Sequence, residues 1–155
     1  MRSYRALWQV ANGLASRNAH VLRFDYFATG ESAGRQSDGA WGRWLEDVHT
    51  AARWLQQHTA LSRVRVLGHR VGALLACDAA ANAEPGNGLQ PEAMTLWDPV
   101  VNGLDWWEHH RRLHAEFTRR RNRFRARRGQ YAETDTDEFL GFHYPSTLIR
   151  DMESR

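Results

Sequence analysis

A chain of 155 residues is long enough for one domain with its own core. Apolar residues make up 42% and charged residues 25%, and no apolar run approaches the roughly 20 residues of a transmembrane helix. The net charge is +3 and every basic residue is arginine, which is a weak argument for nucleic-acid binding. The single cysteine, Cys77, excludes an internal disulfide, and the N-terminus lacks the apolar core of a signal peptide. We therefore expect a cytoplasmic protein.

Helical and extended segments alternate along the first two thirds of the chain. Apolar residues recur at helical spacing between Tyr4 and Leu14, and again between Trp44 and Leu55. The alanine- and leucine-rich residues 71–83 predict a third helix that is largely buried. Runs rich in β-branched and aromatic residues predict three strands, at residues 20–25, 63–67 and 93–97. Strands that alternate with helices favour a parallel sheet, so the predicted fold class is α/β.

The connections and the last third of the chain have a different composition. Residues 28–39 are small, polar and glycine-bearing, which predicts a loop, and Asp38 is a candidate cap for the next helix. Residues 105–128 have helical periodicity but carry nine arginines and three histidines. After Pro145 the pattern predicts one more helix, of two turns.

The most informative segment is Gly68-His69-Arg70-Val71-Gly72, which joins a predicted strand to a predicted helix. Gly-x-x-x-Gly at such a junction is typical of a nucleophile elbow, a sharp turn that pushes its central side chain out at the carboxyl end of the strand. We expect the turn and the close helix packing to require both glycines. Ligands of open parallel sheets bind at this edge, and the Val71 N–H would serve there as an oxyanion donor.

The central position of the elbow holds Arg70. A guanidinium stays protonated at physiological pH, so it cannot act as a nucleophile. It can bind a carboxylate or a phosphate through a bidentate fork. The segment alone is also compatible with a tight turn that carries an exposed arginine and binds nothing.

Two other segments add to this picture. Residues 25–34 read Asp-Tyr-Phe-Ala-Thr-Gly-Glu-Ser-Ala-Gly, and residues 96–103 read Leu-Trp-Asp-Pro-Val-Val-Asn-Gly. The first resembles the α/β-hydrolase loop Asp-x-Arg-Gly-x-Gly-x-Ser, although Phe27 and Ala28 replace its Arg-Gly. With the elbow, the three segments resemble the α/β-hydrolase-like proteins associated with the exosortase A system of bacterial exopolysaccharide and protein sorting. In that branch an arginine at the elbow is usual, and the resemblance extends from Tyr4 to Met152.

The resemblance implies a three-layer α/β-hydrolase-like fold with a partial, mostly parallel sheet, flanking helices and an arginine-rich cap helix. Residues 1–155 would form a single partial domain, with core β-α units at 4–103, a cap or lid helix at 104–137 and a return segment at 138–155. Full-length relatives would catalyse ester or thioester hydrolysis or acyl transfer. The family's first strands would precede Tyr4, and its acid and general-base histidine would follow Met152. We therefore expect no serine-hydrolase activity, and Arg70→Ser alone should not create it.

Asp98 follows the third predicted strand at the same edge as the elbow, which makes it a candidate for the acid. An aspartate before a proline is equally typical of a turn. Ser32 is expected to bond to loop backbone rather than to act as a nucleophile. The residues expected to contact a ligand are His69, Arg70, Val71 and Gly30.

His110 and His114 lie four residues apart on a predicted helix but lack a third metal ligand, so we predict no metal site and no cofactor. The expected partner is a small anionic or acyl substrate. The arginine run at 119–128 contains a single aromatic residue, Phe124, and does not favour nucleic acid over a solvated helix face. A short sheet with uncovered edges predicts self-association. The tryptophans expected to contribute to it are Trp41, Trp44, Trp54, Trp97, Trp106 and Trp107.

Overall fold

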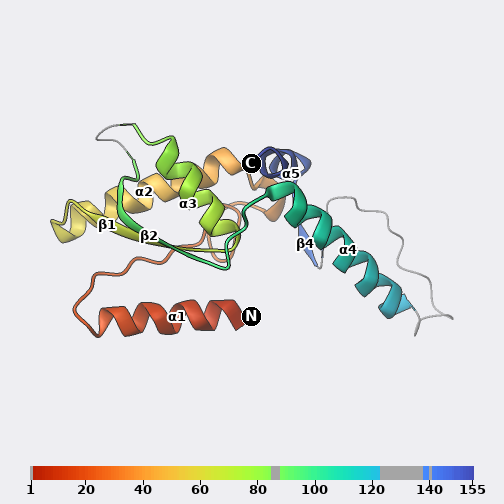
Figure 1. The fold of residues 1–155 in the computed structure, drawn as a ribbon, viewed down its shortest axis with the longest axis horizontal. Coiled ribbons are helices and arrows are strands. Elements are labelled where there is room, and N and C mark those ends of the chain that lie inside the picture. The colour runs from red at the N-terminus through yellow and green to blue at the C-terminus, as the bar shows by residue number, and fades with distance from the viewer. Residues whose placement is uncertain (1, 85–87, 123–137, 140) are drawn as a thin grey trace.

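The computed structural model describes residues 2–84, 88–122, 138–139 and 141–155. These residues form helices and short strands in the order shown in Figure 1. The elements are α1 (Arg2–Ala15), the 3-10 turn η1 (Gln36–Asp38), α2 (Trp41–Thr59), β1 (Val64–His69), α3 (Val71–Ala81), β2 (Pro91–Trp97), α4 (Gly103–Asn122), β3 (Glu138–Phe139), β4 (Phe142–His143) and α5 (Ser146–Glu153). The fold is mixed α/β, as predicted, and the predicted helices and two of the predicted strands are present.

The main sheet consists of β1 and β2, which pair in parallel. Its register brings Leu67 opposite Thr95 and His69 opposite Trp97, with an irregularity between Val64 and Arg65. Helix α3 connects the two strands, so β1-α3-β2 is the β-α-β unit that the sequence predicts. A second, antiparallel pair joins β3 and β4 over two residues each, which the sequence did not indicate.

The prediction of a strand at residues 20–25 is wrong. This segment has no regular secondary structure and pairs with neither strand of the sheet. Val21 and Phe24 are 38% and 41% exposed. Strand propensity reflects how well a side chain fits a pleated, half-buried surface, and without such a surface these residues do not form a strand.

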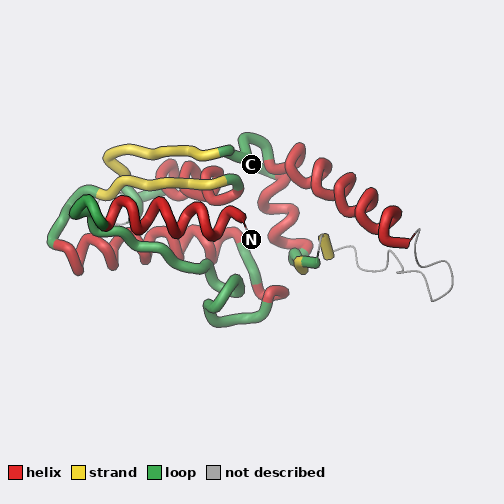
Figure 2. Tube along the Cα trace, turned by 90° about the horizontal axis from the view of Figure 1, so that it is seen from below, coloured by secondary structure: helices red, strands yellow, loops and turns green. Residues whose placement is uncertain are grey.

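The helices lie on both sides of the sheet. Helices α2 and α3 lie on one side of the strands and α1 lies on the other (Figure 1). Figure 2 shows the extended segment after α1 running back along the sheet toward η1. Helix α3 contacts β1, β2 and α2, whereas α4 contacts α5. The sheet is therefore closely packed on the α2–α3 side.

The hydrophobic core is half aromatic and half aliphatic and lies among α2, α3, α4 and α5. Its buried members are Trp41, Trp44, Leu75, Trp107, Phe139, Leu148, Ile149 and Met152. A smaller cluster of Ala52, Val64, Ala79 and Leu89 lies between β1 and helices α2 and α3. Gly103 fits where α4 starts because a Cβ there would collide with the Met152 carbonyl. The core thus depends on α5 reaching back to the beginning of α4.

The expectation that six tryptophans lie on exposed faces is wrong for half of them. Trp41, Trp44 and Trp107 are 1%, 9% and 0% exposed. Trp54 and Trp97 are exposed, as expected. The buried indoles fill the space between helices that residues 138–153 help to enclose, a long-range contact that local periodicity does not show.

Asp78 of α3 joins three parts of the chain. Its carboxylate accepts a 2.6 Å hydrogen bond from Trp41 Nε1 and lies 3.2 Å from Arg155 Nη1. It also accepts from Asn82 Nδ2 at 2.7 Å. The side chain is only 10% exposed, and these donors satisfy the charge that the otherwise apolar helix α3 buries.

Two details of the helix ends differ from the predictions. Asp38 does not cap α2, because it lies in η1 and its carboxylate accepts from the Arg35 N–H at 2.9 Å. The N-cap of α2 is Ala40, without a side-chain bond. Helix α4 begins at Gly103 and is described to Asn122. Residues 123–137, which hold the rest of the arginine run and of the predicted cap or lid helix at 104–137, lie outside the described residues. Within the described ranges, no helix combines the length and apolarity needed to cross a bilayer.

Candidate functional site

The elbow is formed by the end of β1 and the first turn of α3. Arg70 has φ 54° and ψ −121°, a combination that is sparsely populated for a residue with a Cβ and costs of order 1–3 kcal/mol. The flanking backbone is firmly held, because Arg70 N–H donates to the Trp97 carbonyl at 3.1 Å and the Arg70 carbonyl accepts from Ala73 N–H at 2.9 Å. The turn therefore has the sharp, strained strand-to-helix geometry that the sequence predicts.

The two glycines of the elbow differ in what they permit. A Cβ on Gly68 would lie 2.6 Å from Ala73 Cα and 2.9 Å from the Gly72 carbonyl oxygen, so only glycine lets α3 approach β1 this closely. A Cβ on Gly72 would meet its nearest neighbour, the Tyr26 hydroxyl, at 3.7 Å, which is ordinary contact. The prediction that both glycines are required is thus correct for Gly68 and wrong for Gly72.

Arg70 and Asp98 meet across the carboxyl edge of the sheet. Arg70 Nε lies 3.1 Å from Asp98 Oδ2, and the two side chains are 59% and 65% exposed. An ion pair this exposed contributes about 0–1 kcal/mol. The contact uses Nε, and within the described part of the chain neither Nη atom of Arg70 has a hydrogen-bond partner, so both can bind a ligand. The structure thus brings together the two side chains that the sequence places at this edge.

Val71 is the first residue of α3, and the N–H groups of a first helical turn lack intrahelical acceptors. Its amide therefore lies where the sequence places the oxyanion donor. His69 has a different position: it is partly buried and packs edge-on against Trp97, with the ring centroids 5.2 Å apart. It contributes to the wall beside Arg70.

Gly30 belongs to a folded loop beside the elbow. A Cβ at this position, where φ is 53°, would collide with the Asp25 carboxylate, which accepts from the Glu31 N–H at 3.1 Å. Ser32 donates its hydroxyl to the Asp25 carbonyl at 2.6 Å, which confirms the expectation that it bonds to loop backbone. The shape of the loop therefore explains why glycine is needed at position 30, without reference to a ligand surface.

Two residues near the elbow were given no role there by the sequence. Burial, with a smaller contribution from Asp47, raises the pKa of Tyr26 to about 12, and its hydroxyl lies next to Gly72. His110 of α4 stacks on Trp106 at 3.8 Å. Burial lowers the pKa of His110, the hydrogen bond to the Trp106 carbonyl opposes this, and the charges of His109 and Arg70 lower it further. The i, i+4 spacing of Trp106 and His110 was the available signal for the stack.

The two histidines that were considered as metal ligands have other contacts. His110 stacks on Trp106, and the His114 ring packs edge-on against Phe139 at 5.8 Å. Among the residues that the structure describes, no three His, Cys, Asp or Glu side chains are grouped so that they could hold a metal ion.

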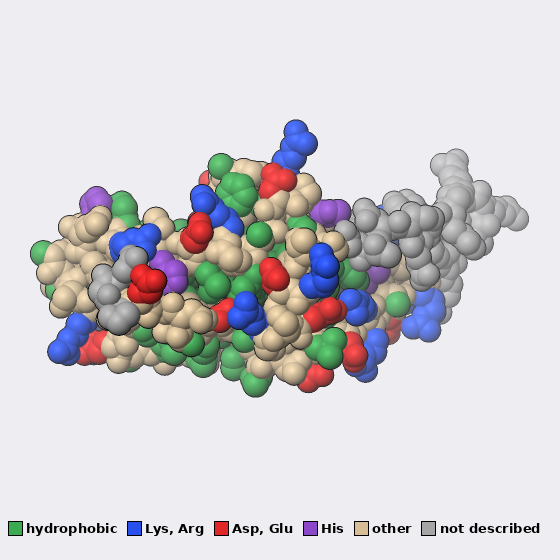
Figure 3. Space-filling model, turned by 90° about the horizontal axis from the view of Figure 1, so that it is seen from above, with side chains coloured by type: hydrophobic (Ala, Val, Ile, Leu, Met, Phe, Trp, Pro, Cys, Tyr) green, Lys and Arg blue, Asp and Glu red, His purple; other side chains and the backbone are tan. Residues whose placement is uncertain are grey.

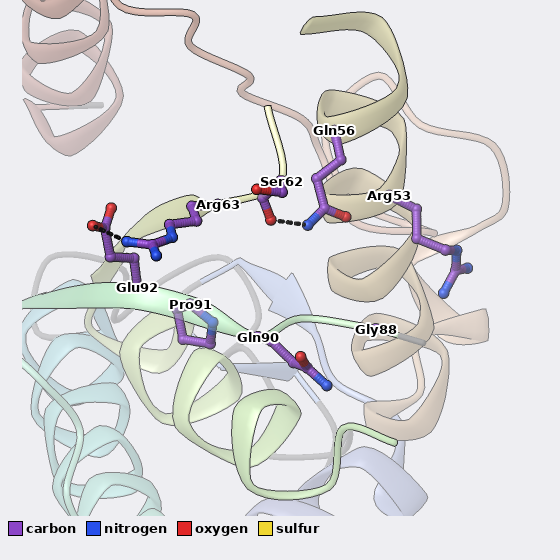
Figure 4. A pocket seen from close by; sticks show the side chains of 8 residues that line it. All are labelled: Arg53, Gln56, Ser62, Arg63, Gly88, Gln90, Pro91 and Glu92. Atoms are coloured by element: carbon purple, nitrogen blue, oxygen red, sulfur yellow. Dashed lines mark hydrogen bonds and ion pairs between the residues drawn. The ribbon is translucent and has the colours of Figure 1, made fainter. Parts of the chain in front are cut away.

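A depression of about 450 Å³ lies at the opposite end of the sheet, where β1 and β2 begin (Figure 4). Gln56 Nε2 donates to the Ser62 carbonyl at 2.9 Å, and Arg63 lies 3.4 Å from Glu92. Its polar groups thus pair with one another, at the edge of a parallel sheet that does not usually bind ligands. The elbow is therefore the better candidate for a ligand-binding site.

Charge elsewhere on the surface is mixed. On the face seen in Figure 3, acidic and basic side chains are interspersed over the described part of the chain. On α4, Arg112 pairs with Glu108 at 3.5 Å and Arg111 pairs with Glu153 at 2.9 Å. The described part of the arginine-rich helix is therefore partly neutralised, which weakens the case for a nucleic-acid surface.

The comparisons with known proteins assign no family to the chain: no protein-family model, no curated protein and no solved structure matches it.

Proposed function

We propose that the chain is a hydrolase-like, non-catalytic anion-binding protein whose site is the Arg70 elbow. In this proposal it derives from the α/β-hydrolase superfamily, and its three-layer architecture and exosortase-associated branch are those that the sequence resemblance implies. The observation that carries the proposal is the conformation of Arg70. The fold holds a residue with a long charged side chain in a strained backbone conformation at the ligand-binding edge of the sheet.

The chemistry follows from the groups at this edge. Arg70 supplies a permanent positive charge and two Nη atoms that no described residue engages, and the Val71 amide supplies a neutral donor at the start of α3. A carboxylate or phosphate oxygen accepts from both. Neither donor can attack an ester, so the proposal includes no serine-type turnover.

The first test measures how acetate and inorganic phosphate bind to the full chain. Amide chemical shifts in an NMR titration report the binding. We expect saturable shifts at residues 69–72, and Arg70→Ala should weaken binding about 10- to 100-fold because it removes a charge-assisted hydrogen-bond pair. Arg63→Ala is the matched control, since it removes the same charge at the other end of the sheet. If both variants bind anions like the parent chain, the proposal is wrong.

The second test is activity. Hydrolysis of a p-nitrophenyl ester by the chain and by Arg70→Ser should equal the buffer rate. Turnover well above buffer that depends on an intact elbow would show a catalytic site and overturn the non-catalytic assignment.

A further inference from the structure

A groove of about 480 Å³ lies between α1 and the end of β2. Its lining is mainly apolar, with Ala6, Val10, Gly13 and Leu14 of α1 and Trp97 of β2. It also includes Gln9 and Arg17, and Arg17 Nη1 donates to the Gly13 carbonyl at 2.7 Å. Val10, Leu14 and Trp97 are 36%, 46% and 42% exposed, so this apolar surface is open to solvent. The volume lies within the roughly 300–1,000 Å³ of small-molecule sites.

Trp97 links the groove to the Arg70 site. It lines the groove and accepts the Arg70 N–H on its carbonyl, and the next residue, Asp98, contacts the guanidinium. The mainly apolar groove and the Arg70–Asp98 pair are therefore joined through the adjacent residues Trp97 and Asp98. This arrangement complements a ligand with one charged end and an apolar body.

We propose that the Arg70 site binds a medium-chain monocarboxylate, the anion of a fatty acid, with its carboxylate on the Arg70 Nη atoms and its alkyl chain in the groove. This inference rests on the proposed anion-binding function. Asp98 decides the charge of the head group, because its carboxylate, 3.1 Å from Nε, repels a second negative charge. A singly charged carboxylate is therefore favoured over a phosphate dianion.

The experiment titrates the full chain with acetate, butanoate, hexanoate and octanoate below their micelle concentrations. Each buried methylene is worth about 0.8 kcal/mol, so affinity should rise roughly fourfold per methylene until the groove is filled. Arg70→Ala should weaken all four acids together, and octanol should bind the parent chain and Arg70→Ala equally weakly.

Variants of the groove separate its contribution from that of the cation. Val10→Asn and Leu14→Asn should reduce the gain from butanoate to octanoate at least fivefold and leave acetate binding unchanged. Leu61→Asn, at an exposed apolar residue outside the groove, is the matched control and should change neither. All three positions are exposed, so we expect the variants to fold.

The outcomes distinguish the two proposals. Two results would overturn the fatty-acid assignment and leave the anion site in place. In the first, acetate binds through Arg70 but octanoate binds no better. In the second, the gain in affinity with chain length survives both groove variants. Phosphate that binds more tightly than acetate would also overturn the fatty-acid assignment and leave the anion site in place. If no carboxylate and no phosphate binds, the anion-binding function itself fails.

Discussion

The two sides of the small sheet are covered very differently. On the α2–α3 side, Trp41 and Leu75 are 1% and 0% exposed and every neighbouring helix contributes to one aromatic core. On the α1 side, Trp8 and Leu67 are 51% and 41% exposed. Helix α3 is rich in alanine and leucine, whereas α1 has a single apolar face that includes Leu7, Val10 and Leu14. The difference teaches that burial here is decided by whether a second element returns to the same place, as α5 does on the first side.

The largest expected difference between the two sides is the loss of stability when a tryptophan is replaced by alanine. Trp41→Ala should lower the free energy of unfolding by about 3–5 kcal/mol, because it empties a packed site and removes the donor to Asp78. Trp8→Ala should change it by about 0.5 kcal/mol or less. Urea denaturation followed by circular dichroism measures both. Equal losses would mean that the α1 side is as well packed as the core.

The next effect concerns Tyr26, whose pKa is raised from 10.0 to about 12. Because the folded pKa is above the unfolded one, the stabilisation is present in full below pH 10 and is lost as the pH rises toward 12. The shift corresponds to about 2–3 kcal/mol. The free energy of unfolding at pH 8 and at pH 11.5 should therefore differ more for the parent chain than for Tyr26→Phe. The same difference in both would show that the phenol is accessible to water.

The elbow allows a sharper test with two glycines four residues apart. Gly68→Ala should destabilise the chain by about 1–3 kcal/mol, because its Cβ would contact the backbone of Ala73 and Gly72. Gly72→Ala should be neutral or stabilise by up to about 1 kcal/mol, since it replaces a helical glycine where space is available. Thermal unfolding of the two variants distinguishes them. A loss of stability in Gly72→Ala would show that the turn is tighter than described.

The smallest expected effect is the release of backbone strain at Arg70. Arg70→Gly should be more stable than Arg70→Ala by about 1–2 kcal/mol, because glycine adopts φ 54° without a steric penalty. Both variants lose the same exposed pair with Asp98, so that contribution cancels. Chemical denaturation of the two variants side by side gives the difference directly. Arg70→Ala as stable as Arg70→Gly would argue against a strained elbow.

Local patterns predicted the elements that have one apolar face and a nearby partner. The periodicities of α1, α2 and α3, the β1-α3-β2 unit and the turn at Arg70 all follow from residues within about 30 positions of one another. The position of Asp98 opposite Arg70 follows as well, since consecutive parallel strands end at the same edge.

Contacts between distant residues were the part that could not be predicted. Nothing in residues 20–25 shows that they lack a strand to pair with, and nothing near Trp107 shows that Phe139 and Tyr144 pack against it. His110 was considered as a metal ligand because its spacing from His114 was visible in sequence, whereas its stack on Trp106 and the influence of Arg70 depend on how α4 packs. The resemblance to hydrolases stays a prediction.

The carboxylate of Asp78 has a consequence for cooperativity. It joins Trp41, in α2, to Arg155, after α5, through one largely enclosed charge in α3, whose side chain is 10% exposed. Opening any one of these segments would leave that charge with fewer donors, which is costly in a low-dielectric interior. Amide hydrogens of α2, α3 and α5 should therefore exchange with solvent deuterium together, at a common opening free energy. The amides of α1, which do not share this carboxylate, should exchange earlier and as a separate unit.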